Sequence, residues 1–390
     1  MLVSKGNLSA FKNAMDFLLS VTHSTCETVA ATPDLLNQVT TQLCKAKTAK
    51  NLIHVVGMGR SFRAGMTIGE LLKDKGFEVS YPGKTLARPI RKNDVVIAVS
   101  GSGWTQTTLH NVEASILRGA KIVSLVGHER SKLGRLSDIV IKIPGVKEVS
   151  KEWSYILKQL NGASSPLAPM GTVNELSAML VGIGIALSIS SDEIEKDFIQ
   201  ITKQIVEQGR KVQQKLNKDY HPIEKILDIY RNLISNQVTK RPATYFVGAG
   251  LSGIVAHMAA MRFQHLGIKV RQTYDWRFRN AGDVVTILSG SGETHVVLEY
   301  ANMAKKAHMN LIGITGFSDS QLAQVSDHSL IIEGRNTRVS QFEEEVQNVE
   351  QFIPTFEFIT AIVLDSIVAQ LAFDFEIDEA TMRAEHTNVE

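Results

Sequence analysis

Residues 94–105, Asp-Val-Val-Ile-Ala-Val-Ser-Gly-Ser-Gly-Trp-Thr, and residues 283–294, Asp-Val-Val-Thr-Ile-Leu-Ser-Gly-Ser-Gly-Glu-Thr, decide the fold of this 390-residue chain. Each stretch is a short apolar run that ends in a turn of serines and glycines. An apolar run of this length, bounded by turn residues, is typical of a buried strand. The near-identity of the two stretches indicates that the chain contains an internal repeat.

A second pair of matching runs lies upstream of the first. Residues 51–59, Asn-Leu-Ile-His-Val-Val-Gly-Met-Gly, correspond to residues 243–250, Ala-Thr-Tyr-Phe-Val-Gly-Ala-Gly. Ser61 and Ser252, which follow these runs, are 191 residues apart, and the downstream pair is 189 residues apart. Since the two spacings almost agree, we interpret the chain as a duplication.

Each half continues as strands alternating with helices. The pattern predicts further strands at 121–126, 139–143, 310–315 and 328–332, and helices at 111–118 and 298–307. Short, almost wholly apolar strands that alternate with helices favour a parallel sheet covered on both faces. Right-handed crossovers then give an α/β fold of two flavodoxin-like three-layer α/β/α sandwiches in tandem.

Helical segments set the limits of the two domains. Residues 8–48 precede the first sheet and residues 223–235 precede the second. Between them, residues 191–220 are charged and favour helix until His221-Pro222 breaks the pattern. We therefore expect one domain over 1–210 and the other over 211–390.

The composition is that of an ordinary globular protein, with 44% hydrophobic residues and a formal net charge of +2. So small a charge gives no reason to expect nucleic acid or an anionic membrane as a partner. Cys26 and Cys44 form no metal or disulfide motif, and we expect both to be buried reduced thiols in a cytoplasmic protein. The most apolar long stretch, 176–189, is too short to span a bilayer and reads as a core helix.

The Ser-Gly-Ser-Gly-x-Thr turn follows a strand and begins a helix in both halves. Glycines allow close approach of an anion, hydroxyls donate hydrogen bonds, and the helix N-terminus supplies free N–H groups. We therefore expect a phosphate cradle that needs neither metal nor cofactor. Its predicted residues are Gly59, Arg60, Ser61, Ser100, Gly101, Ser102, Gly103 and Thr105 in the first half, with Ser252, Ser289, Ser291 and Thr294 in the second.

Two known nucleotide-binding motifs do not fit these turns. No Gly-Lys-Ser/Thr follows, so this is not a Walker loop. Phe62 stands where a dinucleotide fingerprint needs its third glycine. The second half does have Gly248-x-Gly250-x-x-Gly253, but residues 270–273 lack the acidic residue that would bind a ribose. We therefore expect no nicotinamide cofactor.

The paired turns resemble those of sugar isomerase (SIS) domains, which bind phosphosugars. Residues 165–175, which end in Ala-Pro-Met-Gly-Thr-Val-Asn-Glu, resemble a segment of the 6-phospho-3-hexuloisomerases. Gly59-Arg60-Ser61 and residues 261–267 also fit that family, and the terminal His-Thr-Asn-Val-Glu, 386–390, resembles its closing His-Ala-Asn-Leu-Glu.

This resemblance implies an intramolecular oxidoreductase of the ribulose monophosphate pathway, which interconverts 3-hexulose 6-phosphate and fructose 6-phosphate through an enediol. It implies Glu175 as the base and His386 as the group that opens the sugar ring or moves protons between oxygens. Each residue also has a structural alternative: a helix N-terminal carboxylate for Glu175 and a solvated tail residue for His386. Arg60 is either a phosphate or sugar ligand or a surface charge, and His54 is interpreted as a core histidine.

The two halves divide the family pattern between them. The first half has Arg60 and Glu175, whereas the second has Leu251, a counterpart glutamate at Glu357, and the terminal histidine motif. Either both halves complete one composite site, or the second half is a structural or regulatory pseudo-domain. Sites in this family form where domains of different chains meet, which favours the composite site and implies a homodimer with four SIS domains.

Other functions remain open at this level. An aldose–ketose isomerase for glucose or mannose 6-phosphate and an amino-sugar phosphate enzyme would bind the same type of ligand. A non-catalytic sugar-phosphate regulator is a third alternative, although no DNA-binding module is evident.

Overall fold

The computed structural model describes residues 8–32, 34–143, 171–235, 242–273, 275, 279–334 and 352–385. These residues form two compact units. The first unit contains the described residues of 18–143 and 171–204, and the second contains 8–17 and the described residues from 205 onward. The division lies within helix α8 (Ile194–Lys218), which also contains the predicted boundary at residue 210.

The first unit is built on a parallel five-stranded sheet in the order β2-β1-β3-β4-β5. Every residue of the central strand β3 (Val95–Ser100) is buried. This follows from helices on both faces of the sheet, since neither side of a strand then meets water. The other strands are β1 (Ile53–Gly57), β2 (Val79–Ser80), β4 (Lys121–Val126) and β5 (Ile139–Lys142).

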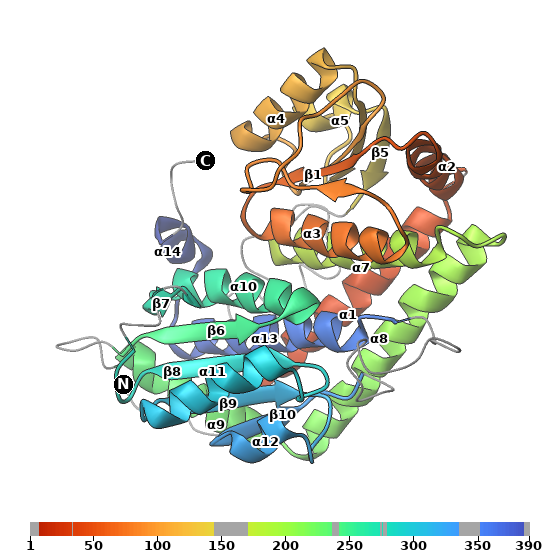
Figure 1. Cartoon of the computed structure of the whole chain (residues 1–390). Coiled ribbons are helices and arrows are strands. Elements are labelled where there is room, and N and C mark those ends of the chain that lie inside the picture. Colours follow the sequence, from red (N-terminus) through yellow and green to blue (C-terminus); the bar gives the residue numbers. More distant parts are fainter. Residues whose placement is uncertain are drawn as a thin grey trace. The chain divides into compact units, whose positions relative to one another are not determined.

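Helices cover both faces of this sheet (Figure 1). One face carries α4 (Gln106–Leu117) and α5 (Lys132–Leu136), and the other carries α3 (Gly59–Asp74) and α7 (Thr172–Ser188). A core between the sheet and the first pair is formed by Val56, Val96, Ala98, Leu109, Val112, Ala120, Ile122, Val126 and Leu133. Helix α2 (Leu35–Thr48) belongs to this unit, whereas α1 (Ser9–Ala30) contributes residues to both units.

The second unit repeats this topology. Its parallel sheet has the order β10-β9-β8-β6-β7, which is the same succession read from the other edge. Its strands are β6 (Thr244–Gly248), β7 (Val270–Arg271), β8 (Val284–Ser289), β9 (Asn310–Thr315) and β10 (His328–Ile331).

The helices of the second unit are placed like those of the first. In Figure 1, α11 (His295–Lys306) and α12 (Gln321–Val325) lie on one face of the sheet, and α10 (Gly250–His265) and α13 (Thr355–Asp374) on the other. Helices α9 (His221–Ser235) and α14 (Glu379–Ala384) complete the unit. The predicted tandem of three-layer α/β sandwiches with parallel sheets is confirmed.

Helix α7 contains most of the apolar stretch 176–189 and is a buried helix, as expected. Helix α13 is a second apolar helix that was not identified from the sequence; it is 20 residues long, with a mean hydropathy of 1.7 over its most apolar window. By length and composition alone α13 could cross a membrane, but 94% of that window is buried inside the protein. The helix packs against α10 and is the central core helix of its unit.

An aspartate fixes the start of the central strand in each unit. Asp94 accepts hydrogen bonds from the backbone N–H groups of Leu52 (2.9 Å) and Arg91 (2.8 Å). Asp283 does the same for Ala243 (2.8 Å) and Asn280 (2.9 Å). The repeated aspartate therefore joins two neighbouring strands at their amino-terminal ends, opposite the Ser-Gly turns.

We expect the first unit to lose stability as the pH falls below 6.5, the ordinary pKa of histidine. His54 is fully buried, with Nε2 3.1 Å from Asp94 Oδ2, and burial lowers its pKa although Asp94 acts in the opposite direction. Because the folded pKa lies below the unfolded one, the unfolded chain binds the extra proton first, and acidification below 6.5 favours unfolding. Urea midpoints measured across this pH range test the prediction. The decline should become shallower in His54→Asn, and an identical decline in that variant would assign it to other groups.

Candidate functional site

The first glycine-rich turn joins β1 to α3. Gly59 has a φ of 53°, a left-handed conformation that glycine adopts without strain. Gly57 is packed so closely that a Cβ there would lie 3.0 Å from Phe62 N and 3.0 Å from Val99 O. The turn therefore holds the N-terminus of α3 against the ends of β1 and β3, with Ser61 half-buried in the first helical turn.

The second turn, residues 100–105, joins β3 to α4. The buried Ser100 Oγ accepts a hydrogen bond from Gly103 N at 3.1 Å and lies 3.2 Å from Thr105 Oγ1. Gly103 has a φ of 70°. Ser102 is exposed, and no side chain among the described residues caps the N-terminus of α4 at Thr105. The N–H groups of α4 and the Ser102 hydroxyl are thus placed where they can bind an anion.

Helix α7 brings a carboxylate to the same edge of the sheet. Glu175 lies in its first turn, and Glu175 Oε2 is 2.6 Å from Arg60 Nε. These two side chains are only 11% and 3% exposed. The neighbouring Asn174 contacts the second turn, because a Cβ on Gly101 would lie 2.5 Å from Asn174 Oδ1. Both turns and the ion pair therefore gather at the carboxyl ends of β1 and β3, where open α/β sheets bind ligands.

This arrangement has a definite chemical capacity. The guanidinium of Arg60 holds the carboxylate of Glu175 in place through a charge-assisted contact. A fixed carboxylate can remove a proton from carbon, and a neighbouring guanidinium can offset the negative charge that then develops on oxygen. In the described ranges, no three His, Cys, Asp or Glu side chains are grouped so that they could hold a metal ion.

The turns of the second unit have the same backbone conformation. Gly250 and Gly292 have φ values of 53° and 70°, equal to those of Gly59 and Gly103. Ser289 Oγ accepts a hydrogen bond from Gly292 N at 3.1 Å and lies 3.1 Å from Thr294 Oγ1. The duplication is therefore preserved in the geometry of the turns.

The second unit differs where the first has its ion pair. Leu251 takes the place of Arg60, and the carboxylate of Glu357 on α13 accepts a hydrogen bond from Ser252 Oγ at 2.9 Å. Glu357 and Ser291 are both buried. Of the hydroxyls predicted to bind phosphate in this unit, that of Ser252 is thus bonded to a carboxylate and that of Ser291 is buried.

We expect an alanine at either turn glycine to destabilise its own unit. A Cβ on Gly103 would lie 2.1 Å from Ser131 Oγ, and one on Gly292 would lie 2.3 Å from Ser320 Oγ. Together with the left-handed backbone, this clash should lower the free energy of unfolding by about 1–3 kcal/mol in each variant. The control is Gly282→Ala, where φ is also positive at 87° but the space is open. Urea denaturation of the three variants should give the smallest loss for Gly282→Ala; equal losses would mean that the clash has no effect.

The predicted site residues fall into two groups. Those of the first half, Gly59, Arg60, Ser61, Ser100, Gly101, Ser102, Gly103, Thr105 and Glu175, all lie around the two turns and the start of α7 in the first unit. Ser252, Ser289, Ser291, Thr294 and Glu357 occupy the matching places in the second unit. His386 lies outside the described residues.

Sequence reasoning missed two serines that support the turns. Ser131 and Ser320 pack against Gly103 and Gly292, and each accepts a hydrogen bond from the backbone at the start of the next short helix, α5 or α12. The signal was present, because 189 residues separate Ser131 from Ser320, the same interval that relates Ser100 to Ser289.

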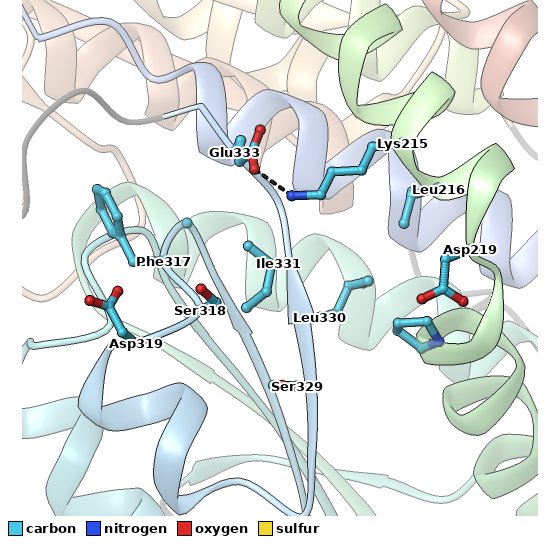
Figure 2. A pocket seen from close by; sticks show the side chains of 12 residues that line it. Lys215, Leu216, Asp219, Phe317, Ser318, Asp319, Ser329, Leu330, Ile331 and Glu333 are labelled. Atoms are coloured by element: carbon cyan, nitrogen blue, oxygen red, sulfur yellow. Dashed lines mark hydrogen bonds and ion pairs between the residues drawn. The ribbon is translucent and has the colours of Figure 1, made fainter.

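A pocket of about 450 Å³ lies elsewhere in the second unit, beside the ends of β9 and β10. Figure 2 shows Lys215 of α8 paired with Glu333 at this pocket, with Asp319 on the loop after β9. The wall of the pocket also contains Asp219. The carboxylates of Asp219, Asp319 and Glu333 therefore line it together with the single ammonium group of Lys215. Their net negative charge disfavours a phosphate, and the pocket contains none of the predicted site residues.

The chain matches a known domain family in two places. The model of the SIS domain matches residues 48–161 and 238–364. The two matches coincide with the two halves of the duplication, and together they span more than half of the chain.

Two proteins of similar sequence each match less than half of the chain. A 3-hexulose-6-phosphate isomerase from Mycobacterium gastri is 30% identical over 162 residues, which are 40% of this chain and 79% of that protein. An uncharacterised protein from Aeropyrum pernix is 36% identical over 140 residues, which are 36% of this chain and 66% of that protein.

Solved structures share the fold over the whole length. The tagatose-6-phosphate ketose/aldose isomerase from Escherichia coli has a TM-score of 0.61 at 11% identity, and the alignment covers 100% of this chain and 98% of that one. At such low identity the likeness concerns the fold alone.

Proposed function

Because the chain belongs to the SIS domain family, we propose that it is a phosphosugar isomerase that interconverts 3-hexulose 6-phosphate and fructose 6-phosphate. One observation carries this proposal: the Arg60–Glu175 ion pair lies at the two serine- and glycine-rich turns of the first unit. The name of the Mycobacterium gastri relative and the motif that ends in Glu175 support the C2–C3 carbonyl shift as the specific reaction.

Glu175 is the proposed base. Its carboxylate takes the proton from C3 of fructose 6-phosphate, and the electron pair of that C–H bond forms the C2–C3 double bond of an enediol. Return of a proton to C2 leaves the carbonyl at C3, so no redox cofactor is consumed. Arg60 would offset charge on the enediol oxygens. We assign the transfer of protons between those oxygens, or the opening of the furanose ring, to His386.

The phosphate is proposed to lie at the first unit's turns. Ser61, Ser102 and the N-terminus of α4 can donate hydrogen bonds to it, while Ser100 and Thr105 shape the turn. The buried state of Ser291 and the Ser252–Glu357 bond favour one catalytic site per chain rather than two.

The proposed assembly is a cytoplasmic homodimer with four SIS domains. It is tested by light scattering of the native chain, which should give twice the mass of one chain. The mass of a monomer would contradict it.

A substrate panel tests the proposed reaction. The chain is incubated with fructose 6-phosphate, glucose 6-phosphate, mannose 6-phosphate and glucosamine 6-phosphate, and the products are separated. We expect conversion of fructose 6-phosphate to 3-hexulose 6-phosphate and no conversion of the aldose phosphates. Turnover of an aldose phosphate would favour the aldose–ketose alternative, and binding without any turnover would favour a regulator.

A further inference from the structure

Two cationic side chains beside the first turn have no role in the proposed reaction. Arg63 lies on α3 two residues after Ser61, and Lys84 lies in the segment that joins β2 to β3. Within the described part of the chain, the other cations of this region that form ion pairs are Arg60, Lys73 and Arg88, whose partners are Glu175, Glu70 and Glu78. No carboxylate in the described residues forms an ion pair with Arg63 or Lys84.

The fold holds Lys84 in a defined place. Lys84 N donates to Tyr81 O at 3.1 Å, and Pro82-Gly83, with Gly83 at a φ of 84°, form the centre of this tight turn. Tyr81 in turn donates to Glu70 Oε1 at 2.6 Å, and its ring meets Phe62 edge-on at 6.1 Å. The turn is therefore fixed on α3, and Lys84 Nζ lies 5.5 Å from the centre of the Phe62 ring.

The two positive charges act on each other. Burial and the charge of Arg63 both lower the pKa of Lys84, and burial lowers the pKa of Arg63. The only hydrogen bond that the Arg63 side chain donates to a described residue goes to the soft acceptor Met66 Sδ at 3.4 Å. Arg63 follows Phe62 in the sequence, and Lys84 Nζ lies 5.5 Å from the centre of the Phe62 ring. Two neighbouring cations that pair with no described carboxylate are typical of a place that binds an anion.

The fold itself does not require this charge. The interval of 191 residues that relates Ser61 to Ser252 places Ile254 at the position of Arg63, and Ile254 is buried in α10. A hydrophobic side chain therefore serves the same helix position in the second unit. The positive charge at Arg63 is an addition to the first unit, which is also the unit with the Arg60–Glu175 pair.

We propose that Arg63 and Lys84 bind a phosphoryl group that is distinct from the one at residues 100–105. Arg63 lies two residues after Ser61 on α3, and Lys84 Nζ lies 5.5 Å from the ring of Phe62, the residue next to Ser61. The ligand class that fits is therefore a sugar carrying a second phosphate, or a free phosphate bound beside the sugar. The presence of a sugar phosphate beside this site depends on the proposed function, whereas the anion site itself is inferred from Arg63 and Lys84.

The test is calorimetric titration of the full chain with fructose 6-phosphate, fructose 1,6-bisphosphate and inorganic phosphate. One charge-assisted contact at the second phosphate should make the bisphosphate bind about tenfold more tightly than the monophosphate. Lys84→Gln and Arg63→Gln should remove that preference, and Arg63→Lys, which keeps the charge, should retain part of it. Arg88→Gln is the matched control: it removes one charge from the same segment, but Arg88 is already paired with Glu78, so the preference should remain.

Each outcome decides the proposal. If the bisphosphate has no advantage but inorganic phosphate binds to the chain saturated with fructose 6-phosphate, and Lys84→Gln abolishes that binding, the site takes a free phosphate and the proposal stands. If neither effect occurs, or if Arg88→Gln acts like Lys84→Gln, the proposal is overturned.

The Ser100→Ala variant separates this proposal from the proposed function. It should weaken fructose 6-phosphate binding and leave the Lys84-dependent binding of phosphate intact. Unchanged binding of fructose 6-phosphate would contradict the assignment of the sugar phosphate to residues 100–105 without affecting the Arg63–Lys84 site.

Discussion

Glu175→Gln lowers the turnover of fructose 6-phosphate by about 10²- to 10⁴-fold, the usual contribution of a positioned general base. Glutamine has nearly the same shape and can still contact Arg60, but it cannot take a proton from carbon. The KM should change little, because the phosphate is bound at the two turns and not by the carboxylate. The measurement is the initial rate of 3-hexulose 6-phosphate formation over a range of substrate concentrations.

The matched control for this variant lies in the second unit. Glu357→Gln makes the same chemical change at the counterpart position and keeps an acceptor for the hydroxyl of Ser252. It should leave turnover unchanged. A loss of rate that is equal in both variants would mean that each unit has a catalytic role, and a full rate in Glu175→Gln would show that another group is the base.

Arg60→Leu, which introduces the residue that the second unit has at this place, should destabilise the first unit. The change removes the cation 2.6 Å from a carboxylate that is only 11% exposed. Breaking a buried pair by removing one partner costs about 3–5 kcal/mol, and the residual exposure of Glu175 places the expected loss at the lower end. Urea denaturation, followed by a probe in the first unit such as the fluorescence of Trp104, measures it.

A double variant distinguishes this explanation from simple loss of packing. If the destabilisation comes from the remaining carboxylate, then Glu175→Gln should recover part of the lost stability when it is added to Arg60→Leu, because a neutral amide needs no cation. If the two losses simply add, the ion pair is not the cause. Arg60→Lys should be intermediate, since it keeps the charge but loses the planar guanidinium.

The fold could be predicted from sequence because its signals are local. Strands such as 121–126 and 310–315 are mostly apolar and are buried after their first residue, and the structure places them as predicted. The starts of helices were predicted less accurately. Helix α4 begins at Gln106 and not at residue 111; its true start was missed because the first turn is polar and has no apolar periodicity. His54 was correctly interpreted as a core histidine. Cys26 is buried as expected, whereas Cys44 is only half-buried.

The site was less accessible to sequence reasoning because its contacts join distant residues. Arg60 and Glu175 were each identified as candidates, but nothing in a spacing of more than a hundred residues indicates that they form an ion pair. Likewise, the second half was known to lack the arginine, yet only the structure places Glu357 against Ser252. The chemical roles of all these residues remain predictions.

The proposed reaction moves a carbonyl between C2 and C3 of a ketose phosphate at the first unit. It is tested most directly by incubating fructose 6-phosphate with the chain in D₂O and following both the product and the carbon-bound protons by NMR. We expect formation of 3-hexulose 6-phosphate, with any deuterium that enters the recovered fructose 6-phosphate located at C3. Formation of an aldose phosphate with deuterium at C2, deuterium at C1 of the recovered fructose 6-phosphate, or the absence of any product would contradict it.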